Sequence, residues 1–476
     1  MSKDQMAALI SLIADSLEAN ETTVKTKNLK ELKKNVHKLT EVSALENGLK
    51  SAIARYLVRG AALDLGIVPA SIHDLYVARG KGEVPSDFTV PAINLRVLPF
   101  DAARAVFRAA MPMDVGALIF EIARSEIGYT HQCPAEFATN ILSAAIVEDY
   151  RGYVFLQGDH FQISPSRYAN DAINEVKAVK DLTKEAIQAG FYNIDVDTST
   201  LVDLNKATVP EQQKVNIQLS AEITAYIRSF EPAGVTISVG GEIGEVGGYN
   251  SNEEELRAYM DGFNSKLDEI APGKPGLSKI SIQTGTSHGG VVLPDGSIAE
   301  VKVDFESLMR LSQVARDEYG MGGAVQHGAS TLPQDAFGKF VEAEACEVHL
   351  ATNFQNIFFD RAPKNMRKEI YAYLEKNHAQ ERKPEMTVDQ FYYKSRKRAL
   401  GPFKKQIWAL PAGLKEDITK TWEDTFQQLF ISLGVANTKK YIDEYISAPK
   451  HLPSLNSYLA IINGKTKDED ASDLAD

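Results

Sequence analysis

The amino-acid sequence predicts an α/β protein: a (β/α)8 barrel (TIM barrel) with helical extensions at its N- and C-terminal ends. Strand-like apolar runs alternate with amphipathic segments from about residue 88 to residue 360, and this alternation is typical of parallel βα units. The runs number eight, which is the number of strands that closes such a barrel. The chain of 476 residues is long enough for a barrel, which takes about 250 residues, together with two extensions.

The eight predicted strands share a short β-prone core that ends in small or polar residues. In chain order they are FTVPAINLR (88–96), VGALIFEIA (115–123), GYVFLQG (152–158), FYNIDVD (191–197), GVTISVGGEIG (234–244), KISIQTG (279–285), GGAVQHG (322–328) and CEVHLAT (346–352). Amphipathic segments such as 169–189 and 253–270 lie between them and are expected to form the outer helices.

The chain divides into four predicted parts. Residues 1–85 form an N-terminal helical extension, because apolar residues recur at helical spacing from Met6 to Leu17 and again further on. Residues 86–360 form the barrel, which is the catalytic domain, and residues 361–463 form a C-terminal helical extension. Residues 464–476 are acidic and polar, so this tail is expected to be disordered.

Composition excludes several classes of protein. The formal net charge is −12, which argues against nucleic-acid binding through a basic surface. No apolar run approaches the length of about 18 residues that would span a membrane, and the N-terminus lacks the pattern of a signal peptide. The two cysteines cannot form a disulfide framework and fit a reducing compartment. We therefore expect a cytoplasmic protein with neither a nucleic-acid nor a membrane partner.

Three histidines each follow a predicted strand, and they are the strongest functional signal in the chain. They are His160 in GDHFQ, His288 in GTSHGG and His327 in QHGAS, while Glu242 follows the fifth strand. Catalytic groups of such barrels gather at the carboxyl ends of the strands, and three imidazoles suit a zinc site with an open position. The plainer interpretation stays open: the histidines and Glu242 as ordinary polar residues of strand ends and turns, and Asp159 as a helix N-cap.

Six motifs in this order resemble the class II, metal-dependent ketose-bisphosphate aldolases over about residues 88–360. They are FTVPAINLR at 88–96, GDHFQ at 158–162, GGEIGEVGG at 240–248, TGTSHGG at 284–290, QHGAST at 326–331 and EVHLATNFQ at 347–355. Each motif is weak alone, and the ordered set is specific. The extensions are longer than in common members, so the chain is expected to be a divergent long form.

The resemblance implies a role for each matching residue. His160, His288 and His327 would bind the catalytic zinc ion, Glu242 would be an alternative ligand, and a second divalent or monovalent cation is allowed. Asp159 would move the proton of the hydroxyl group on the carbon whose bond breaks. The implied substrate and phosphate contacts are Gly289, Gly328, Ser330, His349, Thr352 and one of Arg396 and Arg398.

The sequence also departs from the family pattern. Tyr249 and Asn250 stand where the family usually has an acidic pair, so the base that takes the proton from C1 of dihydroxyacetone phosphate is not assigned by the resemblance. Glu245 is our first choice, and Glu253–Glu255 are substitutes. The run GDHFQISPSRY is also similar to a related barrel subunit that supports a tagatose-bisphosphate aldolase without doing the chemistry.

The resemblance thus implies a zinc-dependent lyase of carbohydrate metabolism (glycolysis and gluconeogenesis). It would reversibly cleave a ketose 1,6-bisphosphate, with fructose 1,6-bisphosphate as first choice, to dihydroxyacetone phosphate and an aldehyde phosphate. A homo-oligomer, dimer or tetramer, is expected. Two alternatives remain: a non-catalytic partner subunit of a tagatose-bisphosphate aldolase-type complex, and an aldolase for another phosphorylated sugar.

Overall fold

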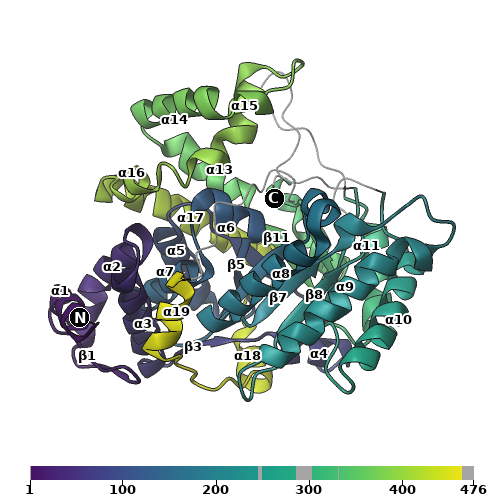
Figure 1. Ribbon diagram of the computed structural model, residues 1–476, viewed down its shortest axis with the longest axis horizontal. Coiled ribbons are helices and arrows are strands. Elements are labelled where there is room, and N and C mark those ends of the chain that lie inside the picture. The colour runs from purple at the N-terminus through teal and green to yellow at the C-terminus, as the bar shows by residue number, and fades with distance from the viewer. Residues whose placement is uncertain (1, 245–248, 286–302, 331, 464–476) are drawn as a thin grey trace.

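Eight parallel strands close into a barrel in the computed structural model, which describes residues 2–244, 249–285, 303–330 and 332–463 (Figure 1). The strands are β4 (Val90–Asn94), β5 (Ile119–Ala123), β6 (Gly152–Gln162), β7 (Asn193–Asp197), β8 (Ser238–Glu242), β9 (Lys279–Ile282), β10 (Ala324–Gln326) and β11 (Glu347–Leu350). Neighbours in this order pair in parallel, and the β11–β4 pair closes the ring. The core of each strand lies in one of the eight predicted runs, so the predicted (β/α)8 fold is confirmed.

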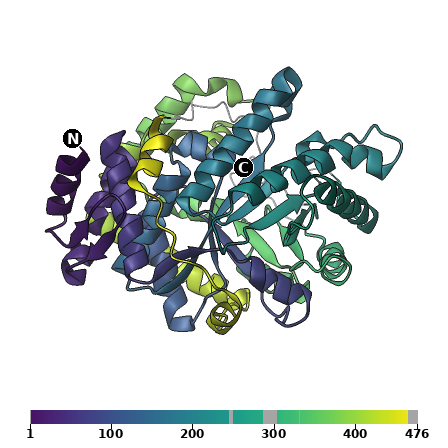
Figure 2. The same cartoon turned by 60° about the horizontal axis from the view of Figure 1, so that its bottom comes forward.

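Helices follow the strands and form the outer layer (Figure 2). They are α5 (Pro99–Ala110), α6 (Arg124–Thr130), α7 (Pro134–Val147), α8 (Pro165–Ala189), α9 (Val209–Phe230), α10 (Glu253–Ile270), α11 (Phe305–Asp317), α12 (Gly338–Glu342) and α13 (Thr352–Arg361), with short 3-10 turns at Met111–Met113, Ser199–Leu201 and Gln334–Ala336. Local sequence fixes several starts: Asn252 and Glu255 form a reciprocal capping box at the start of α10, which satisfies backbone N–H groups that a helix end leaves without partners.

The N-terminal extension is not helical throughout, in contrast to the expectation from the sequence. Its elements are α1 (Ser2–Leu12), β1 (Leu17–Ala19), β2 (Val24–Thr26), α2 (Leu29–Leu45), α3 (Leu49–Asp64), β3 (Ile67–Ala70) and α4 (His73–Gly80). Strands β1 and β2 form an antiparallel hairpin. Strand β3 pairs in parallel with the first half of β6 and so joins the barrel sheet as a ninth strand.

One side chain holds β3 against the barrel. The amide nitrogen of Asn193, at the start of β7, donates to the carbonyl oxygens of Ala70 at 3.2 Å and Leu156 at 2.9 Å. Its amide oxygen accepts from the backbone N–H of Ile72 at 2.9 Å. Asn193 therefore supplies hydrogen bonds at the point where β3 and β7 meet the same edge of β6.

The C-terminal extension wraps back over the barrel. Its helices are α14 (Lys364–Asn377), α15 (Val388–Ser395), α16 (Lys404–Trp408), α17 (Ala412–Ser432), α18 (Lys439–Tyr445) and α19 (Leu455–Asn463), with 3-10 turns at Ala379–Glu381 and Arg396–Ala399. Helix α17 packs against α5, and α19 packs against α3 of the N-terminal extension. Helices α14 and α15 stand at the top of the molecule in Figure 1.

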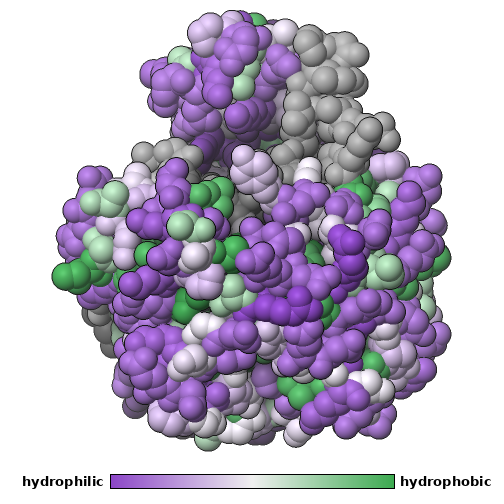
Figure 3. Space-filling view, turned by 90° about the vertical axis from the view of Figure 1, so that its right-hand side faces the viewer, coloured by the Kyte–Doolittle hydropathy of each residue, from purple (hydrophilic) through white to green (hydrophobic). Residues whose placement is uncertain are grey.

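Polar residues cover much of the surface (Figure 3) and also occur inside the barrel. The face drawn in Figure 3 is mainly hydrophilic, with scattered apolar residues. None of the helices within the described ranges is long and apolar enough to cross a membrane. Inside the barrel, the charged residues Glu121, Lys279 and Glu347 have no exposed surface. Buried charges are stable only when they are paired, so these residues mark a network in the interior.

Candidate active site

A bulge in β6 turns two consecutive side chains, Asp159 and His160, toward the barrel interior. Neighbouring residues of a regular strand face opposite sides, but the pairing of β6 with β7 shifts register between Gly158 and Phe161. His160 takes a left-handed backbone conformation, with φ of 39°. A Cβ atom on Gly158 would lie 2.4 Å from the ring of Phe161, so this bulge requires glycine there. Bulges of this kind re-aim side chains next to functional sites.

His160, Glu242 and His327 form a buried cluster at the carboxyl ends of β6, β8 and β10. Their potential ligand atoms all lie within 4.8 Å of one another. The Nδ1 atom of His160 is 3.3 Å from the Oε2 atom of Glu242, and the rings of His160 and His327 have centroids 4.3 Å apart. Two imidazoles and a carboxylate are a donor set that binds zinc and related divalent metals. The chemistry of these residues therefore fits a catalytic metal ion.

Asp197 and Ser281, which are not among the site residues predicted from the sequence, support this cluster. Asp197 ends β7, and its Oδ2 atom is 3.2 Å from Nδ1 of His160. The hydroxyl of Ser281 lies 3.0 Å from Nε2 of His327. Groups that bond to the histidines of a metal site fix the orientation of the rings. Asp197 ends β7, and Ser281 lies in β9. The sequence alone does not show which histidine each of them contacts.

The cluster is rich in negative charge. Burial, followed by the neighbouring Asp197, raises the pKa of Glu242 to about 7. Burial alone would lower the pKa of His160, but the carboxylates of Asp159 and Glu242 outweigh it and raise that pKa well above its usual value. Burial would likewise raise the pKa of Asp197, yet its hydrogen bond to His160 keeps it below the usual range. Such an environment favours a bound cation.

His349 lies deeper in the barrel, beside Asp159. Its Nδ1 atom is 3.1 Å from both Asp159 Oδ1 and Glu121 Oε2, and its Nε2 atom is 2.7 Å from Glu347 Oε1. Lys279 lies 2.5 Å from the same Glu347 oxygen. Burial would raise the pKa of Glu347, but Lys279 and His349 hold it at about 2. Burial and the nearby Asp159 raise the pKa of Glu121 to about 7.

The residues expected to hold the first phosphate lie at the β10 and β11 ends. Gly328 has a left-handed conformation, with φ of 71°. The hydroxyl of Ser330 accepts a hydrogen bond from the backbone N–H of Ala351 at 2.8 Å, which is next to Thr352 at the start of α13. The structure thus brings Ser330 to the N-terminus of a helix, where backbone N–H groups favour anions.

The two candidate arginines point to different places. Arg396 lies between the rings of Phe359 and Tyr393, at 4.6 Å and 4.4 Å from their centroids, and donates to Asn356. Arg398 lies 5.9 Å from the ring centre of Tyr129, which belongs to α6 directly after β5. Lys397 lies 5.7 Å from the same ring centre. Arg398 also lies 3.3 Å from Glu381 Oε1. Each arginine thus contacts a helix that follows a barrel strand: α6 after β5 for Arg398, and α13 after β11 for Arg396.

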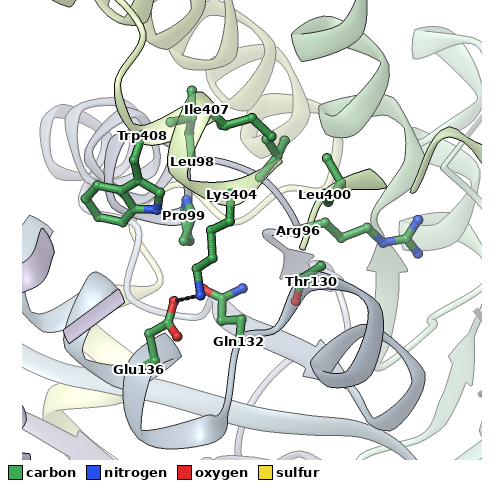
Figure 4. Close-up of a pocket in the computed structure, with 11 residues that line it drawn as sticks. Arg96, Leu98, Pro99, Thr130, Gln132, Glu136, Leu400, Lys404, Ile407 and Trp408 are labelled. Carbon is green, nitrogen blue, oxygen red and sulfur yellow. Dashed lines mark ion pairs between the residues drawn. The ribbon is translucent and has the colours of Figure 1, made fainter. Parts of the chain in front are cut away.

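A pocket lies between the loop after β4 and the C-terminal extension (Figure 4). Leu400, Ile407 and Trp408 form its apolar side, and Lys404 reaches across it to Glu136 at 2.6 Å. Arg96 also lines the pocket, and its Nε atom lies 2.6 Å from Glu126 Oε1. Both basic groups are thus paired with carboxylates. The pocket lies where the loop after β4 meets the C-terminal extension.

Some expectations from the sequence fall outside the described residues. His288, Gly289 and Glu245 belong to this group. Of the two residues that stand in place of the acidic pair, Tyr249 has 80% of its side chain exposed, and the amide nitrogen of Asn250 lies 3.3 Å from Asp304. The third histidine, its glycine and the expected base therefore stay predictions.

Comparison with known proteins decides the family. The family described as fructose-bisphosphate aldolase class-II matches residues 85–405 of the chain. The chain belongs to this family. Class II aldolases are metal-dependent lyases that act on sugar phosphates, and the buried His160, Glu242 and His327 are suited to the metal site that this activity needs. A search of curated proteins finds no match.

Solved structures that match the chain include two aldolases and one protein with another description, all at low sequence identity. A fructose-bisphosphate aldolase from Campylobacter jejuni is 17% identical, with a TM-score of 0.45 over 78% of this chain and 96% of the other. The YdjI aldolase from Escherichia coli K12 is 12% identical, with a TM-score of 0.45 over 77% and 98%. A protein described as a probable tagatose 6 phosphate kinase from Sinorhizobium meliloti 1021 is 14% identical, with a TM-score of 0.50 over 79% and 97%. The last of these agrees with the fold described for this chain.

Proposed function

We propose that this class II aldolase reversibly cleaves a ketose 1,6-bisphosphate, with fructose 1,6-bisphosphate as first choice, to dihydroxyacetone phosphate and an aldehyde phosphate. The observation that carries the proposal is the convergence of His160, Glu242 and His327 within 4.8 Å at one end of the barrel, with Asp159 beside them. Zinc is the proposed metal, because imidazole and carboxylate ligands with an open position are typical of catalytic zinc. His288 is the proposed third imidazole.

Asp159 is the proposed acid–base residue. When bound, the metal ion would polarise the ketose carbonyl group and stabilise negative charge on its oxygen. In cleavage, the carboxylate of Asp159 takes the proton of the C4 hydroxyl as the C3–C4 bond breaks, and the electron pair of that bond moves toward the C2 carbonyl. Glu245 is the proposed group that returns a proton to C3, which becomes C1 of dihydroxyacetone phosphate. The bulge in β6 supports the role of Asp159 beside the metal ligand His160, because it aims both side chains at the same cavity.

Two anion sites would hold the bisphosphate. Gly328, Ser330 and Thr352, with Gly289, are proposed for one phosphate, since Ser330 lies at the N-terminus of α13 and such ends bind anions through backbone N–H groups. Arg398 is the proposed contact of the other phosphate, supported by its place beside Tyr129 of α6. Arg396 has a weaker claim, because Phe359 and Tyr393 enclose its guanidinium group.

Metal analysis combined with an assay tests the proposal. We expect about one zinc ion per chain in the purified protein, cleavage of fructose 1,6-bisphosphate, and loss of both after treatment with a chelator. The affinity of His160→Ala for the metal ion should be lower by at least about tenfold, because a three-ligand site loses one of its imidazoles. His37→Ala is a matched control, since that histidine is exposed on α2 of the N-terminal extension. Full metal content and full activity in His160→Ala would refute the proposal.

A non-catalytic barrel subunit is the second candidate, and one observation favours it. Tyr249 and Asn250 replace the acidic pair, so the proton transfer at C1 lacks its usual carboxylates. Exchange of the C1 proton of dihydroxyacetone phosphate with solvent isolates this step. Exchange in the metal-loaded protein that disappears in Glu245→Gln supports the enzyme; no exchange in the metal-loaded wild-type protein supports the partner subunit. If exchange occurs but fructose 1,6-bisphosphate is not cleaved, the third candidate, an aldolase for another phosphorylated sugar, is favoured.

We also propose that the protein is cytoplasmic and forms a homo-oligomer, a dimer or a tetramer. The chain carries a net charge of −12 and two cysteines, which suits a reducing compartment. Light scattering on the purified protein distinguishes a dimer or tetramer from a monomer.

A further inference from the structure

We propose that His349 is a positioning residue that fixes the carboxylate of Asp159 from beneath, rather than a residue that contacts substrate. This inference rests on the proposed function, because it matters for catalysis only if Asp159 moves the hydroxyl proton. It assigns to His349 a role different from the substrate contact that its place in the sequence had implied.

The contacts of the His349 ring define this role. Its Nδ1 atom faces Asp159 Oδ1 at 3.1 Å, and its Nε2 atom faces Glu347 Oε1 at 2.7 Å. Nδ1 also lies 3.1 Å from Glu121 Oε2. Only 5% of His349 is exposed, against 6% of Asp159. The imidazole thus bridges the proposed acid–base residue and a carboxylate deeper in the barrel.

The lower end of this bridge is fixed by further hydrogen bonds. Lys279 lies 2.5 Å from Glu347 Oε1, and the amide nitrogen of Gln157 donates to the same oxygen at 2.8 Å. The hydroxyl of Tyr76 donates to the other oxygen of Glu347. Glu347, Lys279 and Gln157 come from three different strands and have no exposed surface. A buried network with satisfied groups is rigid, so Glu347 holds the His349 ring in one orientation.

The same contacts argue against His349 as a metal ligand. Ligand atoms of Asp159, His327 and His349 do lie within 4.8 Å of one another. However, both ring nitrogens of His349 face carboxylate oxygens, which accept hydrogen bonds. A ring nitrogen that donates its N–H has no lone pair for a metal. His349 therefore acts on the site through Asp159.

The expected consequence is selective. Asp159 is proposed to act when the bond between carbons breaks or forms, whereas proton exchange at C1 of dihydroxyacetone phosphate does not involve it. Loss of its positioning should slow cleavage and condensation and should leave exchange nearly intact. A general loss of folding or of metal would lower both reactions together.

Two substitutions of His349 separate its two hydrogen bonds. The amide nitrogen of asparagine can take the place of Nδ1 and donate to Asp159, whereas the amide of glutamine reaches the place of Nε2 and contacts Glu347 instead. We expect His349→Gln to lower kcat for cleavage by about 10²-fold, the usual cost of a displacement of about 1 Å in a catalytic group. His349→Asn should recover most of this loss and stay within about tenfold of the wild-type kcat, with KM nearly constant in both.

Metal content, the melting temperature and C1 exchange are measured on the same samples. The proposal predicts that both variants keep their metal and exchange C1 protons at rates within about threefold of each other, so that only cleavage distinguishes them. Equal cleavage rates in His349→Gln and His349→Asn would overturn it, as would parallel losses of exchange and cleavage in His349→Gln. If His349→Gln fails to fold, His349→Asn alone decides: a fall in its cleavage beyond about 10²-fold with exchange retained overturns the proposal.

Asp159→Ala, assayed in parallel, distinguishes failure of this inference from failure of the proposed function. If Asp159→Ala cleaves substrate normally, the proposed role of Asp159 is wrong. If Asp159→Ala is slow and His349→Gln is fast, only the positioning role of His349 is wrong.

Discussion

His160 is held by three carboxylates, and this fixes the direction of its ring. Its Nδ1 atom lies 3.2 Å from Asp197 and 3.3 Å from Glu242, while its Nε2 atom lies 3.9 Å from Asp159. With a backbone φ of 39°, the residue also occupies a conformation that costs about 1 kcal/mol or more for a side chain other than glycine. Strain of this size persists where the surrounding contacts hold it in place, and here those contacts are the acidic groups of the site.

The carboxylate beside His160 gives a direct test at the residue scale. We expect Asp159→Ala to keep its metal and to lower kcat by about 10²–10⁴-fold, the usual contribution of a positioned acid or base. KM for the bisphosphate should change little, because the proton moves in the transition state. Steady-state kinetics with fructose 1,6-bisphosphate and metal analysis of the same preparation check this. A normal kcat would reduce Asp159 to a structural residue.

His73 gives a test of stability against pH. It is buried at the start of α4, and burial, together with the positive charge of Arg228, lowers its pKa from the ordinary 6.5 to about 4. Between these pH values the unfolded chain binds more protons at His73 than the folded protein does, so stability is complete above pH 6.5 and falls as the pH drops toward 4. The contribution lost between pH 7.5 and pH 5 is about 2 kcal/mol.

Urea denaturation at those two pH values measures this contribution. His73→Gln removes the titrating group, so its free energy of unfolding should fall less on acidification than that of the wild-type protein. His378→Gln is the control, because His378 lies in the C-terminal extension beside Glu381, away from His73. Equal acid sensitivity of His73→Gln and the wild-type protein would contradict the role of His73.

The sequence predicted part of the site at this scale, for a physical reason. His160, Glu242 and His327 stand out because they are polar groups directly at strand ends, and strand ends of a barrel converge. Asp197 ends a strand in the same way, but DVDTST carries no histidine or glycine signal. The depth of His349 could not be predicted, because it depends on Glu347 and Lys279 pairing inside the barrel, and a pattern along the chain does not report which charges are paired.

One side chain, Asn193, ties strand β3 to the barrel. The amide of Asn193 makes three hydrogen bonds to backbone groups of Ala70, Leu156 and Ile72. All three lie in the interior, where a polar group without a partner costs about 1–3 kcal/mol. Asn193 thereby couples the N-terminal extension to the barrel.

We expect Asn193→Ala to lower the free energy of unfolding by about 3 kcal/mol, because several buried backbone groups lose a partner at once. Asn377→Ala is the matched control: its amide also bonds to a backbone carbonyl, that of Tyr373, but on the surface. The control should lose less than about 0.5 kcal/mol. Urea denaturation of the three proteins compares the two losses, and equal losses would contradict the role assigned to Asn193.

At the level of elements, the strands of the barrel were predictable and those of the extension were not. The cores of the eight barrel strands are buried, and each lies in a β-prone run that alternates with a helical segment, which is typical of parallel βα units. Strands β1 and β2 have three residues each, too short for an alternating pattern to emerge. Strand β3, IVPA, follows a helix so closely that its apolar residues read as the end of the helical pattern. Its partner residues lie 85 positions further along the chain, since Ile67 pairs with Gly152 and Val68 with Tyr153.

The two extensions contact each other on one side of the barrel. Helix α19 packs on α3, where Tyr458 and Tyr56 meet edge to face with ring centres 6.1 Å apart. The buried guanidinium group of Arg59 donates to the backbone oxygens of Ala189 at 3.1 Å and His451 at 3.4 Å. The start and the end of the described chain are thus joined through side chains that also reach the barrel.

For the molecule as a whole, this contact predicts that a change near the C-terminus weakens the N-terminal extension. Tyr458→Ala should lower the free energy of unfolding by about 3 kcal/mol, the usual cost of deleting a buried aromatic side chain. Hydrogen exchange should also increase in α3, about 400 residues away in sequence. Asn456→Ala, an exposed position on the same helix, is the control. Unchanged exchange in α3 of Tyr458→Ala would show that the extensions are independent.

The bulge in β6 has a consequence for how sequences of this kind are aligned. Before the bulge the odd-numbered residues Gln157 and Asp159 point to the interior contacts, and after it the even-numbered His160 and Gln162 do. The strand therefore changes parity between two adjacent positions. Deleting one residue between positions 158 and 161 would restore the regular alternation of side chains along the strand. Either the aspartate or the histidine would then point away from the cavity. Insertions and deletions should be excluded from this four-residue window even in relatives that share little other sequence.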